Sequence, residues 1–375
     1  MKQVYIFQRR LTHYRVPLFE AMRERLAKRG IDLKVVFGPP GPGEESRQDE
    51  GQLTWGSRVA VHYFFPGSYR LCWHVLPWIA MLKADMLVLP QENALLANYP
   101  LMFLRWLLRM PTAFWGHGRN FQADQKTLRE GFKRWMALRV DWWFAYTRLS
   151  VELVEEQGFP SERIFNLNNA MDVERLQVEK EGIEKKEKRL LRGKLGLEGQ
   201  NVGVFLGSLI EEKRLGLLIS AADRVRNAVP DFELLLIGDG PLRDYVKQEV
   251  SIRPWIRWLG NQGARDKVLS LSLGKVMLNP GMVGLGILDS FVMGIPMVTT
   301  DCGIHSPEIA FLKDGENGLV TRYETGDFAN AVAELLKNEA YRQRLSVRCL
   351  ADSQKYSLAA MTDAFVNGIV QATSR

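Results

Sequence analysis

The chain has 375 residues, of which 46% are apolar and 25% are charged. This length and composition exclude a disordered protein and predict about two globular domains. The formal net charge is +7, and residues 1–170 carry the whole excess, with 23 Lys and Arg against 16 Asp and Glu. Such a basic half can face nucleic acid, an anionic membrane or an anionic substrate, or can be ordinary solvated surface.

The three cysteines, Cys72, Cys302 and Cys349, are scattered and form no CxxC pair. They encode neither a disulfide framework nor a zinc site, so a reducing compartment is expected. The apolar run in MKQVYIFQRR is too short for a signal peptide, and no apolar stretch reaches the ~18 residues of a spanning helix. We expect a cytoplasmic protein, with the inner face of the cytoplasmic membrane as the place of any lipid contact.

Short apolar runs alternate with helical patterns through residues 1–170, as a parallel sheet with crossover helices requires. Pro17 and Gly30 bracket a predicted helix. The polar loop GPPGPGEESRQDEGQ, from Gly38, is predicted to form neither helix nor strand. The predicted strands are 4–7, 33–37, 59–64, 86–89, 112–115 and 142–146.

Residues 172–200 are dense in charge, which predicts a surface linker with an exposed helix. The alternation then restarts, with NVGVFLG, ELLLIG, IRWLG, KVMLNP and PMVTT as strands and amphipathic helices after them. The sequence therefore predicts an α/β protein with two doubly wound, Rossmann-like domains that face each other across a cleft. The predicted boundaries are 1–170, 171–355 and a C-terminal helix, 356–375, that packs back on the first domain.

Two glycine-containing turns in the second half follow predicted strands. Gly207 ends a strand, and Lys213 and Arg214 come just before the next helix, a setting that suits a diphosphate. The turn GDGP places Gly240 before another helix. Ordinary turn chemistry explains each of them equally well.

A third segment, LNPGMVGLGILDSFVMGIP, carries the most information. Gly281, Gly284, Leu285 and Gly286 lie in a glycine-rich loop, and the amides that open the following helix could bind phosphate oxygens. Asp289 lies about one turn into that helix, where its carboxylate could accept hydrogen bonds from ribose hydroxyls. As a plain surface aspartate it would be unremarkable.

In this order and spacing, the three segments resemble glycosyltransferase family 4, retaining enzymes of the GT-B fold. The resemblance extends to GxP at Gly294–Pro296 and to NNAMDVERL at 168–176, which looks like the family's domain junction, and it is weaker in the first half. It implies that the second half binds a nucleotide sugar and the first half binds an acceptor. The implied donor-binding residues are Gly207, Ser208, Lys213, Arg214, Gly240, Gly281, Gly284, Leu285, Gly286, Asp289 and Glu308.

The chain departs from the family's pattern at two positions. Gly281 stands where the family has a carboxylate that holds the donor sugar, and Ser208 stands where it has an arginine. We expect Lys213, helped by Arg214, to neutralise the diphosphate, and the backbone amides of the 281–286 loop to hold the sugar.

In the first half, His117 and Arg119 follow a predicted strand at the position where cleft residues of an open α/β sheet lie. A lone histidine is often structural, and His305, His62 and His74 are expected to be so. Because similar enzymes have a functional histidine in a comparable loop, His117 joins Lys213 as a candidate catalytic residue.

The loop after the first strand, QRRLTHYRVP, is rich in hydrogen-bond donors. Its residues Arg9, His13, Tyr14 and Arg15 are, with Arg119, candidates to bind the acceptor. The same donors could hold an anionic acceptor group or the donor phosphates.

The resemblance implies front-face substitution, in which the leaving diphosphate takes the acceptor's proton while Lys213 and the loop amides stabilise the charge. No carboxylate is evident as the nucleophile of a double displacement. No Asp-x-Asp pair occurs, so neither a metal nor another cofactor is expected. The expected donor is a UDP- or GDP-linked sugar, and the expected acceptor is a glycan or a lipid-linked molecule of cell-envelope polysaccharide or glycolipid synthesis.

Two segments, YRLCWHVLPWIAMLK and NYPLMFLRWLLRM, suit either core packing or peripheral membrane contact; we favour the core. Two other functions stay open. A nucleotide-sugar epimerase of the same fold would convert the donor without an acceptor, and a non-catalytic subunit that holds a partner would agree with the missing acid at Gly281. Nucleic-acid binding is not expected, because no recognised motif accompanies the modest basic excess.

Overall fold

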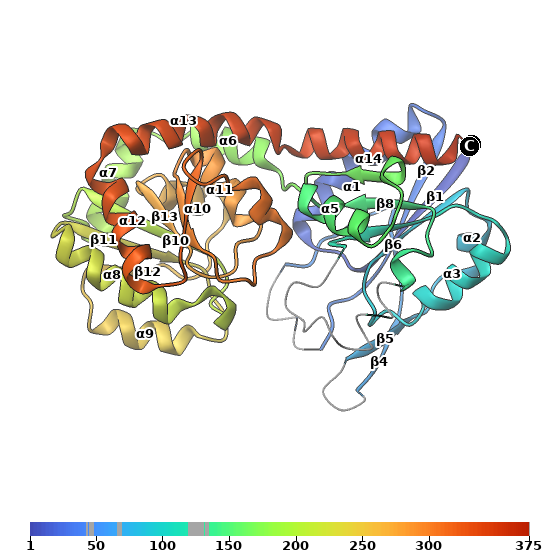
Figure 1. Cartoon of the computed structure of the whole chain (residues 1–375), viewed down its shortest axis with the longest axis horizontal. Helices are drawn as coiled ribbons and strands as arrows, with labels where there is room; N and C mark the ends of the chain where they lie inside the picture. The colour runs from blue at the N-terminus through green and yellow to red at the C-terminus, as the bar shows by residue number, and fades with distance from the viewer. Residues whose placement is uncertain (43, 45–48, 66–69, 119–130, 132–134, 375) are drawn as a thin grey trace. The chain divides into compact units, whose positions relative to one another are not determined.

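The computed structural model describes residues 1–42, 44, 49–65, 70–118, 131 and 135–374. The chain forms two compact units (Figure 1). Unit 1 comprises Met1–Asp172 and Leu358–Arg375, and unit 2 comprises Val173–Ser357. Each change of unit lies two residues after the predicted boundary.

Unit 1 is built on a seven-stranded parallel sheet, among the described residues, with the order β3-β2-β1-β6-β7-β8-β9. Every residue of β6, β7 and β8 is buried, as expected for strands that helices cover on both faces. The strands are β1 (Lys2–Arg10), β2 (Ile31–Gly38), β3 (Ser57–Arg58), β6 (Met86–Pro90), β7 (Thr112–Gly116), β8 (Trp142–Ala145) and β9 (Ile164–Asn166). The described helices include α1 (Val16–Ala27), α2 (Trp78–Lys83), α3 (Asn98–Leu107), α5 (Arg148–Glu156) and α14 (Leu358–Thr373).

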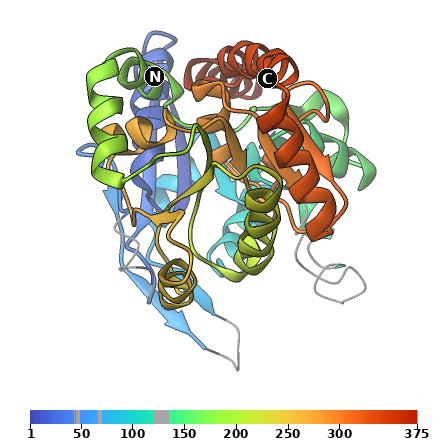
Figure 2. The same cartoon turned by 90° about the vertical axis from the view of Figure 1, so that its left-hand side faces the viewer.

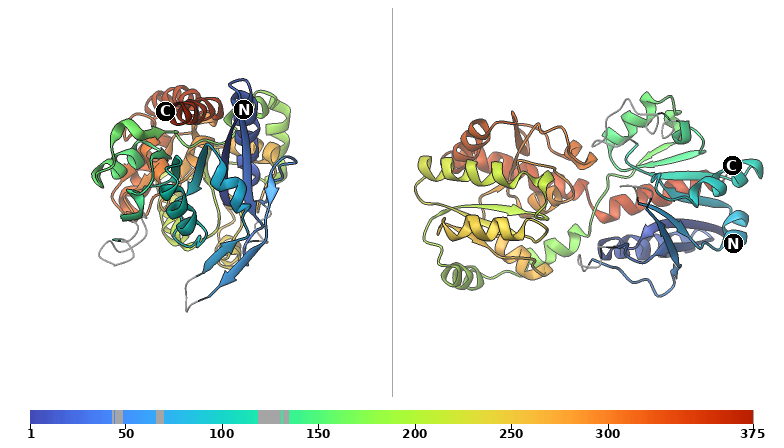
Figure 3. Two further views of the ribbon diagram at one scale, coloured as in Figure 1. Left: turned by 90° about the vertical axis from the view of Figure 1, so that its right-hand side faces the viewer. Right: turned by 90° about the horizontal axis from the view of Figure 1, so that it is seen from below.

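The predicted strand 59–64 does not join this sheet. Its residues Val61–Phe64 form β4, which pairs antiparallel with β5 (Leu71–His74) in a separate hairpin. Figure 3 shows this hairpin projecting from the unit. Alternate residues of β4 are exposed, and one solvated face suits an antiparallel pair better than a parallel sheet buried on both sides.

Helix α14 follows unit 2 in the chain but packs in unit 1, against α1 and strands of the sheet. The Phe365 ring stacks on Phe144 with centroids 4.4 Å apart and meets Trp115 edge-on at 5.0 Å. A Cβ atom at Gly368 would lie 2.5 Å from the Phe144 ring. Glycine at this position therefore lets the helix approach β8 closely enough to bury Phe365.

Unit 2 contains a six-stranded parallel sheet, among the described residues, with the order β12-β11-β10-β13-β14-β15 (Figure 2). The predicted strands correspond to β10–β14; the pattern does not predict β15, a four-residue strand with one buried residue. The strands are β10 (Asn201–Leu206), β11 (Phe232–Ile237), β12 (Ile256–Trp258), β13 (Val276–Leu278), β14 (Met297–Thr300) and β15 (Gly318–Thr321). The helices include α8 (Leu215–Ala228), α9 (Arg243–Ser251), α10 (Ala264–Leu271), α11 (Gly286–Met293), α12 (Thr325–Lys337) and α13 (Glu339–Lys355).

The charged segment after residue 172 forms two helices, α6 (Val173–Glu181) and α7 (Lys185–Leu195). Helix α7 has no buried residue, as predicted for an exposed helix. Helix α6 instead packs on α10 and α11, and the Lys180 ammonium donates to the Val292 carbonyl at 2.8 Å. The predicted linker is therefore exposed along α7 but packed on one side along α6.

Candidate functional site

The candidate donor-binding residues of unit 2 gather at the carboxyl ends of β10, β11 and β13. Strand β10 pairs with β11 on one side and with β13 on the other. The winding of the sheet reverses between β10 and β13, and ligands of open α/β sheets bind outside the strands at such a switch point.

Glycines let the loops after β10 and β11 touch. A Cβ atom at Gly238 would lie 1.9 Å from the Gly207 carbonyl oxygen, and one at Gly240 would lie 2.6 Å from the Leu209 carbonyl oxygen. The Leu209 amide donates to the Asp239 carbonyl at 3.0 Å. Close packing thus accounts for Gly238 and Gly240. Contact of Gly207 and Gly240 with a donor stays a prediction.

Lys213 is a buried cation at this edge of the sheet. Its side chain is 9% exposed, and its ammonium donates to the Met282 carbonyl at 2.6 Å. No carboxylate among the described residues forms an ion pair with it. Burial lowers the pKa of Lys213 to about 8, so the ammonium is charged at neutral pH but poorly compensated.

Gly281 occupies the position of the absent acid, and the structure gives a steric reason for glycine. A Cβ atom there would lie 2.2 Å from the Glu212 carbonyl oxygen and 2.6 Å from the Lys213 Cα atom. The Met282 amide donates to that same Glu212 carbonyl at 2.8 Å. A carboxylate side chain at 281 is therefore incompatible with the observed position of the Lys213 loop.

The loop after β13 leads into α11, which begins without a side-chain cap. The amides of Ile287 and Leu288 bond back to Gly284 and Leu285. In the described part of the chain, the amides of Gly284, Leu285 and Gly286 have no such acceptor. Unpaired amides at a helix start attract anions, so this end of α11 can accept phosphate oxygens.

His305 is a structural clamp on the same loop. Its Nδ1 atom accepts from the Val283 amide at 3.0 Å, and its Nε2 atom lies 2.7 Å from the Thr300 carbonyl oxygen. These partners require the proton on Nε2. Burial lowers the pKa of His305, so the imidazole stays neutral and holds the glycine-rich loop against β14, in agreement with the structural role expected for it.

Arg214 lies next to Lys213 in a strained conformation. Its φ of 54° places this non-glycine residue in the left-handed region. Its Nε atom is sealed from solvent without a hydrogen-bond partner in the described chain, and its guanidinium carbon lies 5.7 Å from the centre of the Tyr323 ring. Strain of this kind clusters at functional sites, which agrees with a binding role for Arg214.

Three other residues predicted to bind the donor differ in their burial and in their partners. The Asp289 carboxylate is buried and lies 2.6 Å from the Lys267 ammonium, so one of its oxygens is already paired. Glu308 is buried in the turn Pro307–Phe311, and Ser208 is exposed. Contacts of these residues with a ribose or a sugar remain predictions.

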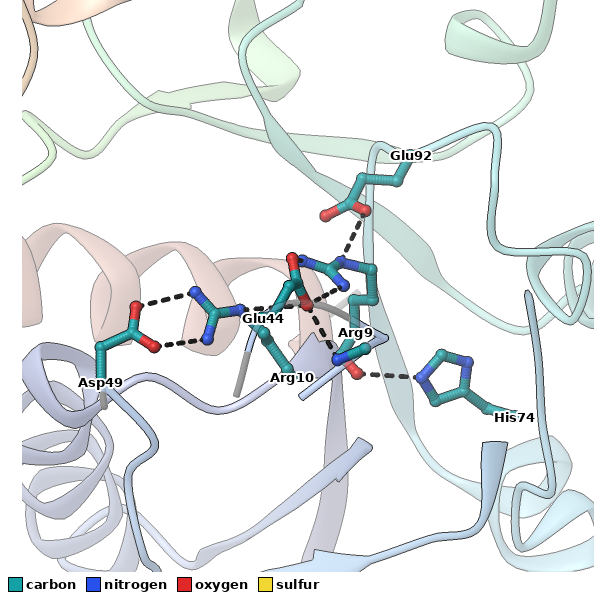
Figure 4. Close-up of polar contacts among 7 residues, drawn as sticks. Arg9, Arg10, Glu44, Asp49, His74 and Glu92 are labelled. Atoms are coloured by element: carbon teal, nitrogen blue, oxygen red, sulfur yellow. Dashed lines mark hydrogen bonds and ion pairs between the residues drawn. The ribbon is translucent and has the colours of Figure 1, made fainter. Parts of the chain in front are cut away.

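Strand β1 extends to Arg10, beyond the predicted strand 4–7, so Arg9 and Arg10 lie at its end and not in the loop after it. Both form ion pairs with the polar segment after β2 (Figure 4). Arg9 bonds both oxygens of Glu44, at 2.8 and 2.9 Å, and Arg10 bonds both oxygens of Asp49, at 2.6 and 2.8 Å. The Arg9 guanidinium and the Gly41 amide hold the pKa of Glu44 at about 2. The charge of Arg9 is therefore largely satisfied inside the protein, which weakens its predicted role in acceptor binding.

Arg15, in the turn after β1, differs from Arg9 and Arg10. It is 5% exposed, and its guanidinium carbon lies 4.8 Å from the Trp115 ring centre, 5.1 Å from that of Tyr14 and 5.6 Å from that of Tyr146. His13, in the same turn, is exposed and meets the Tyr14 ring edge-on at 6.2 Å. The structure thus brings His13, Tyr14 and Arg15 together after β1.

His117 follows β7 at the same edge of the sheet. Its ring meets the Tyr146 ring edge-on at 4.3 Å. The Gln91 side chain bonds both the amide and the carbonyl of Gly118, at 2.9 and 3.1 Å, and so positions this loop. His117 is exposed to solvent. The protein around it and the Arg15 charge lower the pKa of His117, which favours a neutral imidazole; Arg119 lies outside the described residues.

Sequence reasoning missed the residues around Arg15 and His117. Tyr146 follows the last residue of β8, and Gln91 follows the last residue of β6. Both positions carry the strand-end signal that selected His117, so this rule could have found them had it been applied to every strand.

Comparisons with known proteins agree with this geometry. The family model Glycosyl transferases group 1 matches residues 200–338. The alpha-D-kanosaminyltransferase of Streptomyces kanamyceticus is 27% identical over 191 residues, 46% of each chain. The phosphatidyl-myo-inositol mannosyltransferase of Mycobacterium leprae is 26% identical over 147 residues, 38% of each chain. The chain thus spans less than half the length of these two curated relatives.

A solved structure extends the likeness to the whole chain. Anabaena HepE, crystallised with UDP, is 16% identical and superposes with a TM-score of 0.71 over 99% of this chain and 100% of its own; another structure of HepE contains UDP-glucose. This likeness confirms the predicted GT-B fold class. Residues 200–338, which carry Lys213 and the 281–286 loop, match the model of the group 1 glycosyltransferases, in agreement with the family resemblance of the second half.

Proposed function

We propose that this protein is a retaining glycosyltransferase that moves a hexosyl group from a UDP- or GDP-linked donor to a glycan or lipid-linked acceptor of the cell envelope. One observation carries the proposal: the buried, uncompensated ammonium of Lys213 lies at the switch point of the second sheet, in the loop packed against Gly281. The UDP in HepE and the transferase names of the relatives support a nucleotide-sugar donor.

The chemistry assigned to unit 2 is charge stabilisation on a leaving diphosphate. The acceptor hydroxyl oxygen attacks the anomeric carbon from the face that the diphosphate leaves, the bond from carbon to phosphate oxygen breaks, and the hydroxyl proton passes to the departing phosphate. Lys213, Arg214 and the amides at the start of α11 would stabilise the negative charge. This scheme needs no metal, and transfer should continue in EDTA.

The sugar and acceptor would be held by uncharged groups. With no carboxylate at Gly281, the amides of the 281–286 loop take the donor sugar's hydroxyls in this proposal. The neutral imidazole of His117 can accept or donate a hydrogen bond to the acceptor or the sugar. His117→Gln, which keeps hydrogen bonding, should retain more activity than His117→Ala.

Calorimetry with UDP, GDP and their sugar conjugates tests the donor site. Wild type should bind one nucleotide, and Lys213→Ala should lose at least tenfold in affinity, because a charge-assisted hydrogen bond contributes about 1.5–3 kcal/mol. Lys247→Ala, on the exposed surface of α9, is the matched control. Absence of binding to any nucleotide would favour the non-catalytic subunit, and conversion of a donor sugar without acceptor would favour the epimerase.

We also propose peripheral membrane contact through α3. In this helix a charged residue is buried and apolar residues are exposed. Arg105 is fully buried and donates to the carbonyls of Met81 and Ala84 at 2.8 and 3.0 Å. Phe103, Trp106 and Leu107 are instead 60–64% exposed. The favoured interpretation of this segment as core is therefore wrong for its outer face.

The charge around that face favours an anionic lipid surface. Lys83 ends α2, which contacts α3, and the exposed Arg109 follows α3. Aromatic and aliphatic side chains with flanking cations suit an interfacial helix. No helix in the described part of the chain is long and apolar enough to cross a bilayer.

Vesicle sedimentation tests this contact. Wild type should pellet with phosphatidylglycerol-containing vesicles, and simultaneous Phe103→Ser, Trp106→Ser and Leu107→Ser should abolish pelleting. Val347→Ser, an exposed apolar position on α13, should not change it. Equal pelleting of the triple variant would refute the contact.

A further inference from the structure

The cation of Arg15 has an unusual environment among the buried cations of the described chain. Arg105 is fully buried, and its guanidinium donates to four oxygen atoms. Lys213 donates to a carbonyl at 2.6 Å. Arg15 has one recorded hydrogen bond, from Nη1 to the Met361 sulfur at 3.8 Å, and thioether sulfur is a weak acceptor.

Three aromatic rings partly compensate this charge. The faces of Trp115, Tyr14 and Tyr146 surround the guanidinium, and each cation–π contact contributes about 0.5–2 kcal/mol. Rings do not replace a counter-ion, because desolvating an unpaired cation costs several kcal/mol. No nitrogen of Arg15 is both sealed from solvent and unbonded, so the N–H groups that lack a hydrogen bond keep contact with solvent.

The two arginines at the end of β1 show that cations in this part of unit 1 can be satisfied internally. Arg9 and Arg10 each bind a carboxylate with two hydrogen bonds. Arg15, five residues later, forms no ion pair in the described chain. Its forked donors match a carboxylate or a phosphate, so the missing acceptor is best supplied by a ligand.

The surroundings indicate which substrate carries that anion. In the proposed function, Lys213, Arg214 and the amides of α11 serve the donor's diphosphate, and all of them belong to unit 2. Arg15 belongs to unit 1, where it acts electrostatically on His117 and packs on Tyr146, which also touches the His117 ring. An anion on Arg15 would therefore be held beside the group proposed to orient the acceptor or the sugar.

We infer that Arg15 and its aromatic cage of Tyr14, Trp115 and Tyr146 form a binding site for an anionic group, a carboxylate or a phosphate, on the acceptor. This inference rests on the proposed function and narrows its acceptor class from glycans in general to acidic ones. The rings would pack against the acceptor body while the guanidinium holds its anion.

Two probes and one neutral analogue test the site by calorimetry. Wild type should bind glucose 6-phosphate or glucuronate more tightly than glucose, and the stronger of the two anions identifies a phosphate or a carboxylate. Arg15→Met should weaken binding of that anion about ten- to hundredfold. The anion affinity of Arg15→Lys should lie between those of wild type and Arg15→Met, because lysine keeps the charge but lacks the paired N–H donors of a guanidinium. Arg29 is an exposed arginine just after α1, so the affinity of Arg29→Ala should match that of wild type.

Thermal unfolding separates binding from a structural role. Replacing an unpaired buried cation by an apolar side chain of similar length is often neutral or stabilising, so Arg15→Met should melt at or above the wild-type temperature. A lower melting temperature for Arg15→Met with unchanged anion binding would overturn the inference. Equal affinity of wild type for glucose and both anions would also overturn it.

Nucleotide binding keeps the two proposals apart. Arg15→Met should bind UDP or GDP as wild type does; parallel loss of nucleotide binding would place Arg15 in the donor site and refute the acceptor assignment. If wild type binds the anionic probes but no nucleotide, the anion site stands while the proposed transferase function fails.

Discussion

Replacing Gly281 by alanine tests why the chain lacks an acid at this position. The new Cβ atom would lie 2.2 Å from the Glu212 carbonyl oxygen and 2.5 Å from the Lys213 carbonyl carbon, both backbone atoms that cannot rotate away. Relief requires the Lys213 loop to move, which threatens the bonds from Lys213 Nζ and from the Met282 amide. Overpacking costs about 1–3 kcal/mol and each lost hydrogen bond about 1 kcal/mol, so we expect a loss of about 3 kcal/mol.

Thermal unfolding and nucleotide calorimetry measure the two consequences. For a unit of this size, about 3 kcal/mol corresponds to a decrease in melting temperature of roughly 6–12 °C, and displaced Lys213 should weaken nucleotide binding at least tenfold. Gly284→Ala is the matched control, because its nearest neighbour, the Ser306 hydroxyl, would lie 3.7 Å from the new Cβ. If Gly281→Ala and Gly284→Ala have the same melting temperature and the same nucleotide affinity, the steric explanation for the missing acid is wrong.

Four further changes probe separate features of the two units. Because the pKa of Lys213 is lowered to about 8, its ammonium loses its proton as the pH rises through 8, so nucleotide affinity should fall between pH 7 and 9; calorimetry on Lys213→Arg should show no such fall. Arg214→Gly should stabilise the fold by about 1 kcal/mol, since it removes left-handed strain, yet should weaken nucleotide binding; higher affinity would count against a binding role. His305→Ala removes two contacts of the glycine-rich loop and should lower the melting temperature and raise the donor KM, whereas unchanged values would mean that the loop does not need the clamp. Gly368→Ala places a Cβ 2.5 Å from Phe144 and should destabilise unit 1 by about 1–3 kcal/mol, as a urea titration followed by the fluorescence of that unit's tryptophans would show.

Sequence patterns predict the sheets well because parallel strands buried on both faces are short, continuous apolar runs. This signal located β1, β2, β6, β7, β8 and β10–β14, and the glycine turns after them led to the Lys213 site. The hairpin strand β4 carries a similar apolar run, but its partner is set by pairing that no local pattern encodes.

Side-chain partners are less predictable than strand ends. Arg9 and Arg15 are six residues apart in the sequence and look equivalent there as hydrogen-bond donors. Their difference comes from Glu44, which folds back from a polar loop onto Arg9, and from Trp115 and Tyr146, which follow two other strands onto Arg15. Such long-range contacts depend on the assembled sheet. Sequence reasoning therefore selected this segment but could not tell that, among the described residues, Arg9 is paired with a carboxylate and Arg15 is not.

The return of α14 to unit 1 also bears on how the protein is made. Residues 358–373 are synthesised after all of unit 2, yet Met361 accepts from Arg15 and Phe365 fills the space between Trp115 and Phe144. Unit 2 is contiguous and can fold on the ribosome as soon as it emerges, whereas unit 1 must wait with this part of its core uncovered. Truncation before residue 358 should therefore yield a chain whose later half is folded and whose earlier half is prone to aggregate.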